Sequence, residues 1–482
     1  MVSGDGNGTL DVFVRDVKAG HTTRVSVDSL GIEGNGICAT PAMSANGRYI
    51  AYGAWATNLV AGDINAVRDV FVHDRKSERT IRASLTAPGT QADHTSVGPS
   101  ITASGRYIAF HSSATNLVAN DTNAASDVFV HDRKTGRTTR VSVSSFGIEG
   151  DGDSRDPAIS ANGRYVAFVS AATTLVAGDG NESSDVFVHD RKTGQTTRVS
   201  VDSLGNEAGF GSFNPMISAS GRYVVFWSMA TNLVVGDGNG SSDVFVHDRK
   251  TGQTTRVSVD SAGIEGNFGS EFPAISANGR HVAFHSSASN LVSGDGNGTL
   301  DVFVHDRKTR QTTRVSVNSA ADEGNDVSYG ASLSANGRYV AFLSYAGNLV
   351  PGDPGGVRDA FVHDRVTGQT TKVSVNEAGV GGNDESTGLR ITADGRYVAF
   401  ISLATNLVAG DGNGTFDVFV RDLKAGQTTR VSVDSAGIEG NDSSVGVAIS
   451  ANGRYVAFDS LASNLVLGDV NGNIDVFVRD MK

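Results

Sequence analysis

A repeat of 58 residues runs through the whole chain and constrains the fold more than any other feature. The motif DVFV, or its variant DAFV, begins nine times at this spacing, at Asp11, Asp69, Asp127, Asp185, Asp243, Asp301, Asp359, Asp417 and Asp475. A second motif, GRY or GRH, begins eight times at the same spacing, from Gly47 to Gly453. Units repeated at this period indicate an architecture in which each unit buries its faces against its neighbours.

Each repeat is expected to contain four short strands. In the repeat near Pro157, the segment PAIS is followed by Asn162-Gly163, a strong hairpin signal, and then by RYVAFVS. A loop, LVAGDGNESS, leads to DVFVHD, and a short turn at residues 192–195 leads to TTRVSV. β-Branched and aromatic residues fill these runs, and turn-forming residues fill the gaps. The repeat therefore predicts a four-stranded antiparallel meander.

The second and third strands are nearly continuous apolar runs, so both faces of each sheet must be covered. One aromatic recurs on each of these strands, as in Phe168 and Phe187, and is predicted to form the core between neighbouring sheets. Repetition of such meanders around a ring covers both faces and leaves only short edges. We therefore expect an all-β fold, an eight-bladed β-propeller of 58-residue four-stranded antiparallel blades.

The ends of the chain predict how this ring closes. Residues 1–482 are expected to form a single β-propeller domain of eight repeats, in which residues 1–27 and 448–482 together form the closing blade. The N- and C-terminal strands would then share a blade. The third strand, however, occurs nine times and the other strands eight times. The surplus copy has three alternatives: it adds a fifth strand, displaces its twin or lies free.

The repeat also resembles a known family. PAIS-ANGRYVAF followed by DVFVHDRKTG and TTRVSV is similar to the PD40, or TolB-like (WD40-like), β-propeller repeat. That pattern has a Pro-x-x-Ser strand, a Gly-containing turn, an IAF-type strand and a strand ending in Asp before a Gly turn. The resemblance covers essentially the whole chain and implies a propeller fold. The long loop between the second and third strands departs from the basic repeat.

Composition excludes several classes of partner. The net charge is -12 and no basic run exists, so the sequence does not predict nucleic-acid binding. No apolar run approaches the roughly 18 residues of a membrane-spanning helix. The single cysteine, Cys38, excludes an internal disulfide framework. Met1 leads directly into VSGDGNG, so no signal peptide is expected in this chain. A monomer is expected.

The loop that enters the third strand carries the pattern most suggestive of a metal site. Residues 179–185 read D-x-N-x-S-x-D, with oxygen-bearing side chains at alternate positions. Calcium takes six to eight oxygen ligands from such carboxylates, amides and carbonyls. We therefore predict several Ca²⁺ ions per chain. The predicted ligands are Asp5, Asn7, Asp11, Asp63, Asn65, Asp69, Asp121, Asn123, Asp127, Asp179, Asn181, Asp185, Asp237, Asn239, Asp243, Asp295, Asn297, Asp301, Asp411, Asn413, Asp417, Asp469, Asn471 and Asp475.

Two further observations bear on these loops. The loop after the fourth strand carries a carboxylate at matching phase, at Glu33, Glu149, Glu207, Glu265, Glu323 and Glu439, and is expected on the same face. The alternative is that Asp and Asn simply form Asx turns, which need no metal. The seventh unit, around Asp353, lacks the asparagine and is expected to bind most weakly.

Catalysis needs one asymmetric group of residues, and near-identical repeats provide poor material for one. The first hypothesis is therefore a non-enzymatic calcium-binding scaffold that interacts with a protein or a glycan, secreted or on a bacterial cell surface. The second is a hydrolase or lyase with an active site in the central channel. Its candidate residues occur in one copy only, namely His94, His111, Trp227, Glu271, Glu385 and Arg390. The third is an engineered or recently amplified scaffold without a ligand.

Overall fold

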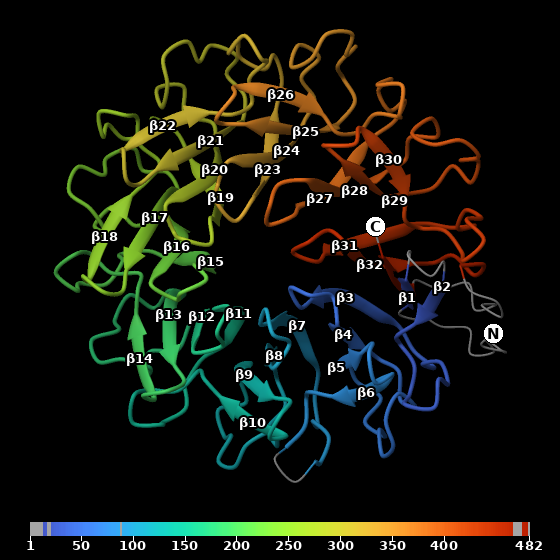
Figure 1. Cartoon of the computed structure of the whole chain (residues 1–482). Helices are drawn as coiled ribbons and strands as arrows, with labels where there is room; N and C mark the ends of the chain where they lie inside the picture. The colour runs from blue at the N-terminus through green and yellow to red at the C-terminus, as the bar shows by residue number, and fades with distance from the viewer. Residues whose placement is uncertain (1–12, 17–20, 87–88, 466–474, 481–482) are drawn as a thin grey trace. The chain divides into compact units, whose positions relative to one another are not determined.

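A computed structural model describes residues 13–16, 21–86, 89–465 and 475–480. Within these residues every regular element is a β-strand, and the strands follow the predicted four-strand repeat. Figure 1 shows the strands in chain order. No helix in this part of the chain is long and apolar enough to cross a membrane.

The strands of each repeat are named here by their position in the sheet. The first strands are β3 (Cys38–Met43), β7 (Ser96–Ile101), β11 (Ser154–Ile159), β15 (Ser212–Ile217), β19 (Ser270–Ile275), β23 (Ser328–Leu333), β27 (Ser386–Ile391) and β31 (Ser444–Ile449). The second strands are β4 (Tyr49–Ala54), β8 (Tyr107–Ser112), β12 (Tyr165–Ser170), β16 (Tyr223–Ser228), β20 (His281–Ser286), β24 (Tyr339–Ser344), β28 (Tyr397–Ser402) and β32 (Tyr455–Ser460). The third strands are β1 (Phe13–Asp16), β5 (Asp69–Asp74), β9 (Asp127–Asp132), β13 (Asp185–Asp190), β17 (Asp243–Asp248), β21 (Asp301–Asp306), β25 (Asp359–Asp364), β29 (Asp417–Asp422) and β33 (Asp475–Asp480). The fourth strands are β2 (His21–Arg24), β6 (Arg79–Arg82), β10 (Arg137–Arg140), β14 (Gln195–Arg198), β18 (Gln253–Arg256), β22 (Gln311–Arg314), β26 (Gln369–Lys372) and β30 (Gln427–Arg430).

The number of four-stranded blades differs from the prediction. Among the described residues, seven sheets have four strands in sequential order, and one further sheet has five strands in the order β2-β1-β33-β32-β31. The chain is therefore an all-β propeller with seven blades of four antiparallel strands. The prediction of an eight-bladed β-propeller with four antiparallel strands in every blade is wrong, because the remaining sheet has a fifth strand and a parallel pair.

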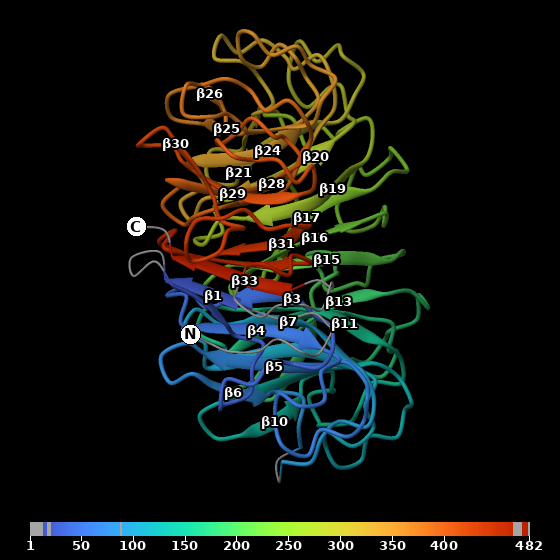
Figure 2. The same cartoon turned by 90° about the vertical axis from the view of Figure 1, so that its right-hand side faces the viewer.

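The five-stranded sheet contains strands from both ends of the chain. Strand β33 pairs antiparallel with β32, and β1 pairs parallel with β33. Figure 2 shows β1 beside β33. The segments 11–16 and 475–480 have the identical sequence DVFVRD. Both copies of this third strand enter the sheet, so the surplus copy adds a fifth strand, which was one of the three alternatives. The sequence contains no feature that assigns the place next to β32 to one copy rather than the other.

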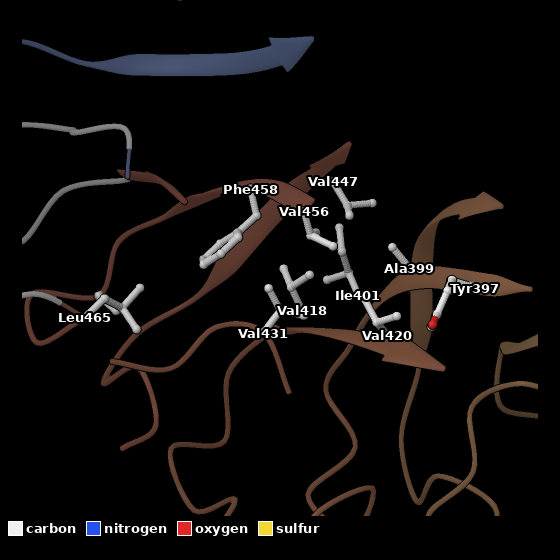
Figure 3. Packing of buried hydrophobic residues seen from close by; sticks show 11 residues of the cluster. Tyr397, Ala399, Ile401, Val418, Val420, Val431, Val447, Val456, Phe458 and Leu465 are labelled. Carbon is white, nitrogen blue, oxygen red and sulfur yellow. The ribbon is translucent and has the colours of Figure 1, made fainter. Parts of the chain in front are cut away.

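The chain divides into two compact units. Unit 1 comprises residues 1–124, 129–139 and 373–482, and unit 2 comprises residues 125–128 and 140–372. Within each unit, successive sheets pack face to face through buried aliphatic and aromatic side chains. In unit 1, Figure 3 shows Phe458 and Val456 of β32 together with Val418 of β29 in one such layer. In unit 2, Phe168 and Phe187 are fully buried with ring centroids 5.9 Å apart, which confirms their predicted place in the core.

Candidate metal centre

The loop that enters β17 brings three carboxyl groups together in unit 2. Asp237 lies in this loop, Asp243 is the first residue of β17, and Glu265 comes from the hairpin that follows β18. One carboxylate oxygen of each residue lies within 4.8 Å of the other two. The side chains of Asp237 and Asp243 are 2% and 0% exposed, so water screens them little. We call these three residues the Asp237 cluster.

Arg256, the last residue of β18, contacts every member of the cluster. Its Nη1 lies 3.4 Å from Asp237 Oδ2, 3.1 Å from Asp243 Oδ2 and 2.7 Å from Glu265 Oε1. Its Nη2 donates to the Gly236 carbonyl at 3.0 Å. One guanidinium therefore forms ion pairs with three carboxyl groups. If all three ionise, negative charge exceeds positive charge by two.

This crowding changes the ionisation of the cluster. Burial, and then the nearby charge of Asp243, raise the pKa of Asp237 to about 7. Burial raises the pKa of Asp243 to about 6, although a hydrogen bond from Ser258 opposes the effect. Burial also disfavours ionisation of Glu265, but the N–H groups of Gly238 and Asn239 outweigh it and lower the pKa of that carboxyl. The cluster is therefore poised to bind protons or another cation.

We expect the Asp237→Asn variant to be more stable than the parent chain at pH 8, by about 1–3 kcal/mol. Asp237 has a folded pKa of about 7 and an unfolded value of 3.8, so its ionisation costs stability as the pH rises through that window. The advantage should vanish at pH 4, where the parent carboxyl is protonated. Urea unfolding in EDTA at both pH values measures it.

The matched control for this experiment is Asp248→Asn in the same sheet. A hydrogen bond and the charge of Arg222 outweigh burial and lower the pKa of Asp248, so its neutralisation should destabilise the fold at pH 8. Burial lowers the pKa of His247 to about 4, so this histidine also titrates near the lower pH of the experiment. It titrates in the parent chain as well, so comparison with the parent removes its contribution. An Asp237→Asn variant that is less stable than the parent chain at pH 8 would contradict the raised pKa of Asp237.

Asn239 supports the loop, as the Asx-turn interpretation predicts. Its Oδ1 accepts the N–H of Ser241 at 2.7 Å, which closes an Asx turn. Its Nδ2 donates to the Gly266 carbonyl at 2.7 Å and to Asp243 Oδ2 at 3.5 Å. The amide oxygen is therefore engaged by the backbone, and the oxygens that converge in the cluster are carboxylate oxygens.

The same arrangement recurs in other sheets, with one arginine at the end of the fourth strand. The further clusters are Asp179, Asp185 and Glu207 with Arg198; Asp295, Asp301 and Glu323 with Arg314; and Asp411, Asp417 and Glu439 with Arg430. Arg140 likewise contacts Asp127 at 2.9 Å and Glu149 at 2.8 Å. These acidic clusters are able to hold a metal ion, and five of the six predicted glutamates join them, namely Glu149, Glu207, Glu265, Glu323 and Glu439. Among the described residues Glu33 forms an ion pair with Arg24 but joins no such cluster.

Two loops gather fewer carboxyl groups. Arg82 contacts the carboxyl groups of Asp63 and Asp69, and Gln91 occupies the position of the glutamate. In the seventh unit, Lys372 contacts Asp353 at 3.1 Å and Asp359 at 2.6 Å. Gly381 occupies the glutamate position there. Each of these two loops therefore has two carboxyl groups for one cation, an excess of one negative charge, and the weakest binding stays a prediction for the loop around Asp353.

The remaining predicted ligands are placed as follows. Asn65, Asn181, Asn297 and Asn413 each donate to the Asp that begins the next third strand, as Asn239 does. Asp121 and Asn123 lie partly exposed in the loop before β9. Asp5, Asn7, Asp11, Asp469 and Asn471 lie outside the described residues, and Asp475 is described only as the first residue of β33.

Sequence reasoning missed the arginine of each cluster. The residue ends the motif TTR in six of the eight repeats, as Arg198 and Arg256 do, and the other two repeats read TIR at Arg82 and TTK at Lys372, so the signal was available. Its role depends on register, because Phe245 of β17 pairs with Arg256 of β18 and so brings Arg256 close to the start of β17. The predicted cation site therefore already contains one cationic side chain.

No family model and no curated protein matches the chain. Among solved structures, dipeptidyl peptidase 4 of Porphyromonas gingivalis is 14% identical with a TM-score of 0.53, covering 87% of this chain and 56% of that chain. A structure from a study of two prolyl endopeptidases is 12% identical with a TM-score of 0.50, covering 92% of this chain and 61% of that chain. TolB from Acinetobacter baumannii is 13% identical with a TM-score of 0.33, covering 71% of this chain and 80% of that chain.

The repeated four-stranded sheets define the class of protein as a β-propeller. At such low identity the likenesses to solved structures concern the fold alone, and the similarity to the PD40 repeat remains a resemblance of motifs. The chain spans 56% and 61% of the two peptidase chains, so it matches only part of their length.

Proposed function

We propose that this chain is a non-enzymatic binding scaffold whose loop clusters take up calcium. The observation that carries the proposal is the charge of the clusters, in which three carboxyl groups share one arginine. In addition, Asp237 Oδ1 is buried and has no hydrogen-bond partner. The donors are all oxygens, which calcium prefers. Calcium would supply charge neutralisation, and it would compete with Arg256 for the same carboxylates.

Repetition favours a scaffold over an enzyme. The same cluster is built at least four times from the same residue types, whereas a catalytic site needs one asymmetric group of residues. Identical sites suit several weak contacts that act together. The peptidases that share the fold are longer chains, so their activities are not transferred to this chain.

The proposal extends to partner and location. The partner is a protein or a glycan that contacts the loop face, and the chain acts outside the cell or on a bacterial surface. The supporting reason is chemical: extracellular modules bind calcium with dissociation constants of about 0.1–1 mM. Sites with a resident arginine belong in this weak range, because the ion must displace part of an existing ion pair.

Thermal unfolding of EDTA-treated protein, with calcium or magnesium added back, tests the proposal. Binding to the folded chain alone adds about 2.7 kcal/mol per site at one hundred times the dissociation constant. We therefore expect a large rise in melting temperature with calcium, a smaller one with magnesium, and several calcium ions per chain by mass spectrometry. The Asp237→Asn variant should bind one ion fewer. If calcium leaves the melting temperature unchanged and no calcium is bound, the proposal is wrong, and the arginine is the only cation that the clusters hold.

A further inference from the structure

A groove lies between two neighbouring sheets of unit 2, the β15–β18 sheet and the β19–β22 sheet. Strand β18 and the hairpin after it line one side, and β21 and the turn that follows it line the other. The groove has a volume of about 550 Å³, within the range of roughly 300–1,000 Å³ that ligand pockets occupy. Its polar lining includes Gln253, Thr255, Asp260, His305, Arg307 and Arg310. We call it the β18 groove.

Contacts between the two sheets hold the walls of the β18 groove in place. Ser261 Oγ, in the hairpin after β18, donates to the Thr312 carbonyl of β22 at 3.4 Å and accepts the N–H of the same residue at 3.1 Å. On the opposite wall, Arg307 Nη1 donates to the Gly279 carbonyl at 2.7 Å. The guanidinium of Arg307 also lies 4.1 Å from the centroid of the Tyr223 ring. The groove is therefore formed in the free chain, and a ligand does not have to order its walls.

The charged side chains in the β18 groove favour an anionic ligand. Arg307 and Arg310 contribute two positive charges, and Asp260 contributes one negative charge. Arg256 also lines the groove, but it is already paired with three carboxyl groups. His305 is uncharged at neutral pH, because burial lowers its pKa to about 4. The groove therefore carries one net positive charge, on a chain whose net charge is -12.

Arg310 supplies the charge that distinguishes this groove. Its guanidinium makes no ion pair or hydrogen bond with any residue that the structure describes. Its φ angle of +62° is close to the +74° of Gly252, the equivalent residue of the preceding repeat, so the turn keeps its shape and the side chain is what differs. Glycine also stands at this position at Gly136, Gly194, Gly368 and Gly426, and one repeat has Glu78 there. The turn therefore does not need the arginine.

The preceding repeat provides a natural comparison. Residues 185–203 and 243–261, which contain β13 with β14 and β17 with β18, are identical in sequence. The wall that β18 forms is thus repeated in β14, whereas the guanidinium opposite it is not, because Gly252 takes the place of Arg310. A ligand that needs this guanidinium would bind the β18 groove and not the equivalent place beside β14.

We propose that the β18 groove binds a saccharide that carries a carboxylate group. In this protein a guanidinium binds a carboxylate through Nε and Nη2 together, as Arg222 does with Asp248 at 2.8 and 2.6 Å. Arg310 has the same two atoms available. The carboxylate of the ligand pairs with Arg310 in the same way and neutralises the net charge of the groove.

The rest of the lining favours a saccharide over a peptide as the bearer of that carboxylate. The amide of Gln253 and the hydroxyl of Thr255 are able to donate to sugar hydroxyl groups and to accept from them. Most of the lining residues are polar or charged, and none is Phe, Tyr or Trp. Protein partners instead obtain most of their binding energy from a few large anchors in well-packed pockets. The inference rests on the proposed scaffold function, selects its glycan alternative and does not require calcium.

An array of neutral, carboxylated and sulfated oligosaccharides, probed with the full chain in EDTA, tests the proposal. We expect carboxylated members to bind and their carboxyl-reduced forms not to bind. In calorimetric titration, Arg310→Gly and Arg310→Gln should each lower the affinity for a carboxylated member by about tenfold or more, because a charge-assisted pair is lost. Lys308→Ala removes the same charge two residues away, outside the groove lining, and should bind as the parent chain does.

A structural role for Arg310 would give a different result. Because glycine is the residue that other repeats hold at this turn, the melting temperature of Arg310→Gly should not fall below that of the parent chain. A clear fall in both Arg310 variants would mean that the side chain stabilises the fold and would overturn the proposal. No bound member, equal binding of carboxylated and carboxyl-reduced members, equal binding by all variants, binding of sulfated members alone, or Arg310-dependent binding of acidic peptides in place of saccharides would also overturn it. Saccharide binding in EDTA without any calcium-induced stabilisation would retain this inference and remove only the calcium proposal.

Discussion

Replacement of Arg256 by leucine should destabilise the chain by about 3–5 kcal/mol at pH 8 in EDTA. The arginine side chain is 6% exposed and contacts three carboxyl groups, two of which are almost fully buried. Without it, the Asp237 cluster holds buried carboxylates with no cationic partner, which is among the most costly single changes in a folded protein. Urea unfolding gives the change in the free energy of unfolding.

Three comparisons separate the electrostatic effect from a general packing defect. Arg256→Lys should cost much less, because Lys372 fills the equivalent place in the seventh unit. Arg222→Leu should cost much less than Arg256→Leu, because Arg222 binds Asp248 through two hydrogen bonds but is 39% exposed. Acid, or calcium if it binds, should restore part of the stability lost by Arg256→Leu. Equal losses for Arg256→Leu and Arg222→Leu would contradict the charge balance described for the cluster.

The sequence predicts the strands well where local signals and spacing agree. The segment DVFVHD forms β13 over Asp185–Asp190, and RYVAFVS contains β12 over Tyr165–Ser170. The first strand begins earlier than PAIS, at Ser154, because an irregular register between Arg155 and Ala158 extends its pairing with β12. The fourth strand ends at Arg198, before the VSV of the predicted strand.

Two features lay beyond sequence reasoning for a common physical reason, which is that both depend on pairing between strands. The arginine enters its acidic cluster only because strand register places it beside the first residue of the third strand. The fifth strand arises because two copies of DVFVRD are equally suited to the same sheet. Local patterns predict that a strand forms, but they do not determine which of two identical segments takes a given neighbour.

Gly221→Ala should destabilise the chain by about 2–5 kcal/mol, through strain and overpacking together. Gly221 has a φ angle of +76°, and a Cβ atom there would lie 2.1 Å from Cδ2 of Tyr165 in the preceding sheet. The tyrosine ring has little freedom to move, because the guanidinium groups of Arg164 and Arg249 lie 4.8 and 4.1 Å from its centroid. Arg249 also donates to the Gly221 carbonyl at 2.7 Å.

Gly236→Ala is the matched control, since it isolates the backbone strain from the clash. Gly236 has a φ angle of +79°, and no atom lies within 4 Å of a Cβ placed there, so its loss should be about 1–2 kcal/mol. In urea unfolding, the difference between the two variants measures the contact between neighbouring sheets. Removal of the ring in Tyr165→Ala should make the further cost of Gly221→Ala approach that of Gly236→Ala. If Gly221→Ala were no worse than Gly236→Ala in the parent chain, the glycine of the GRY motif would serve its turn alone, and the tyrosine contact would contribute nothing to the packing of one sheet on the next.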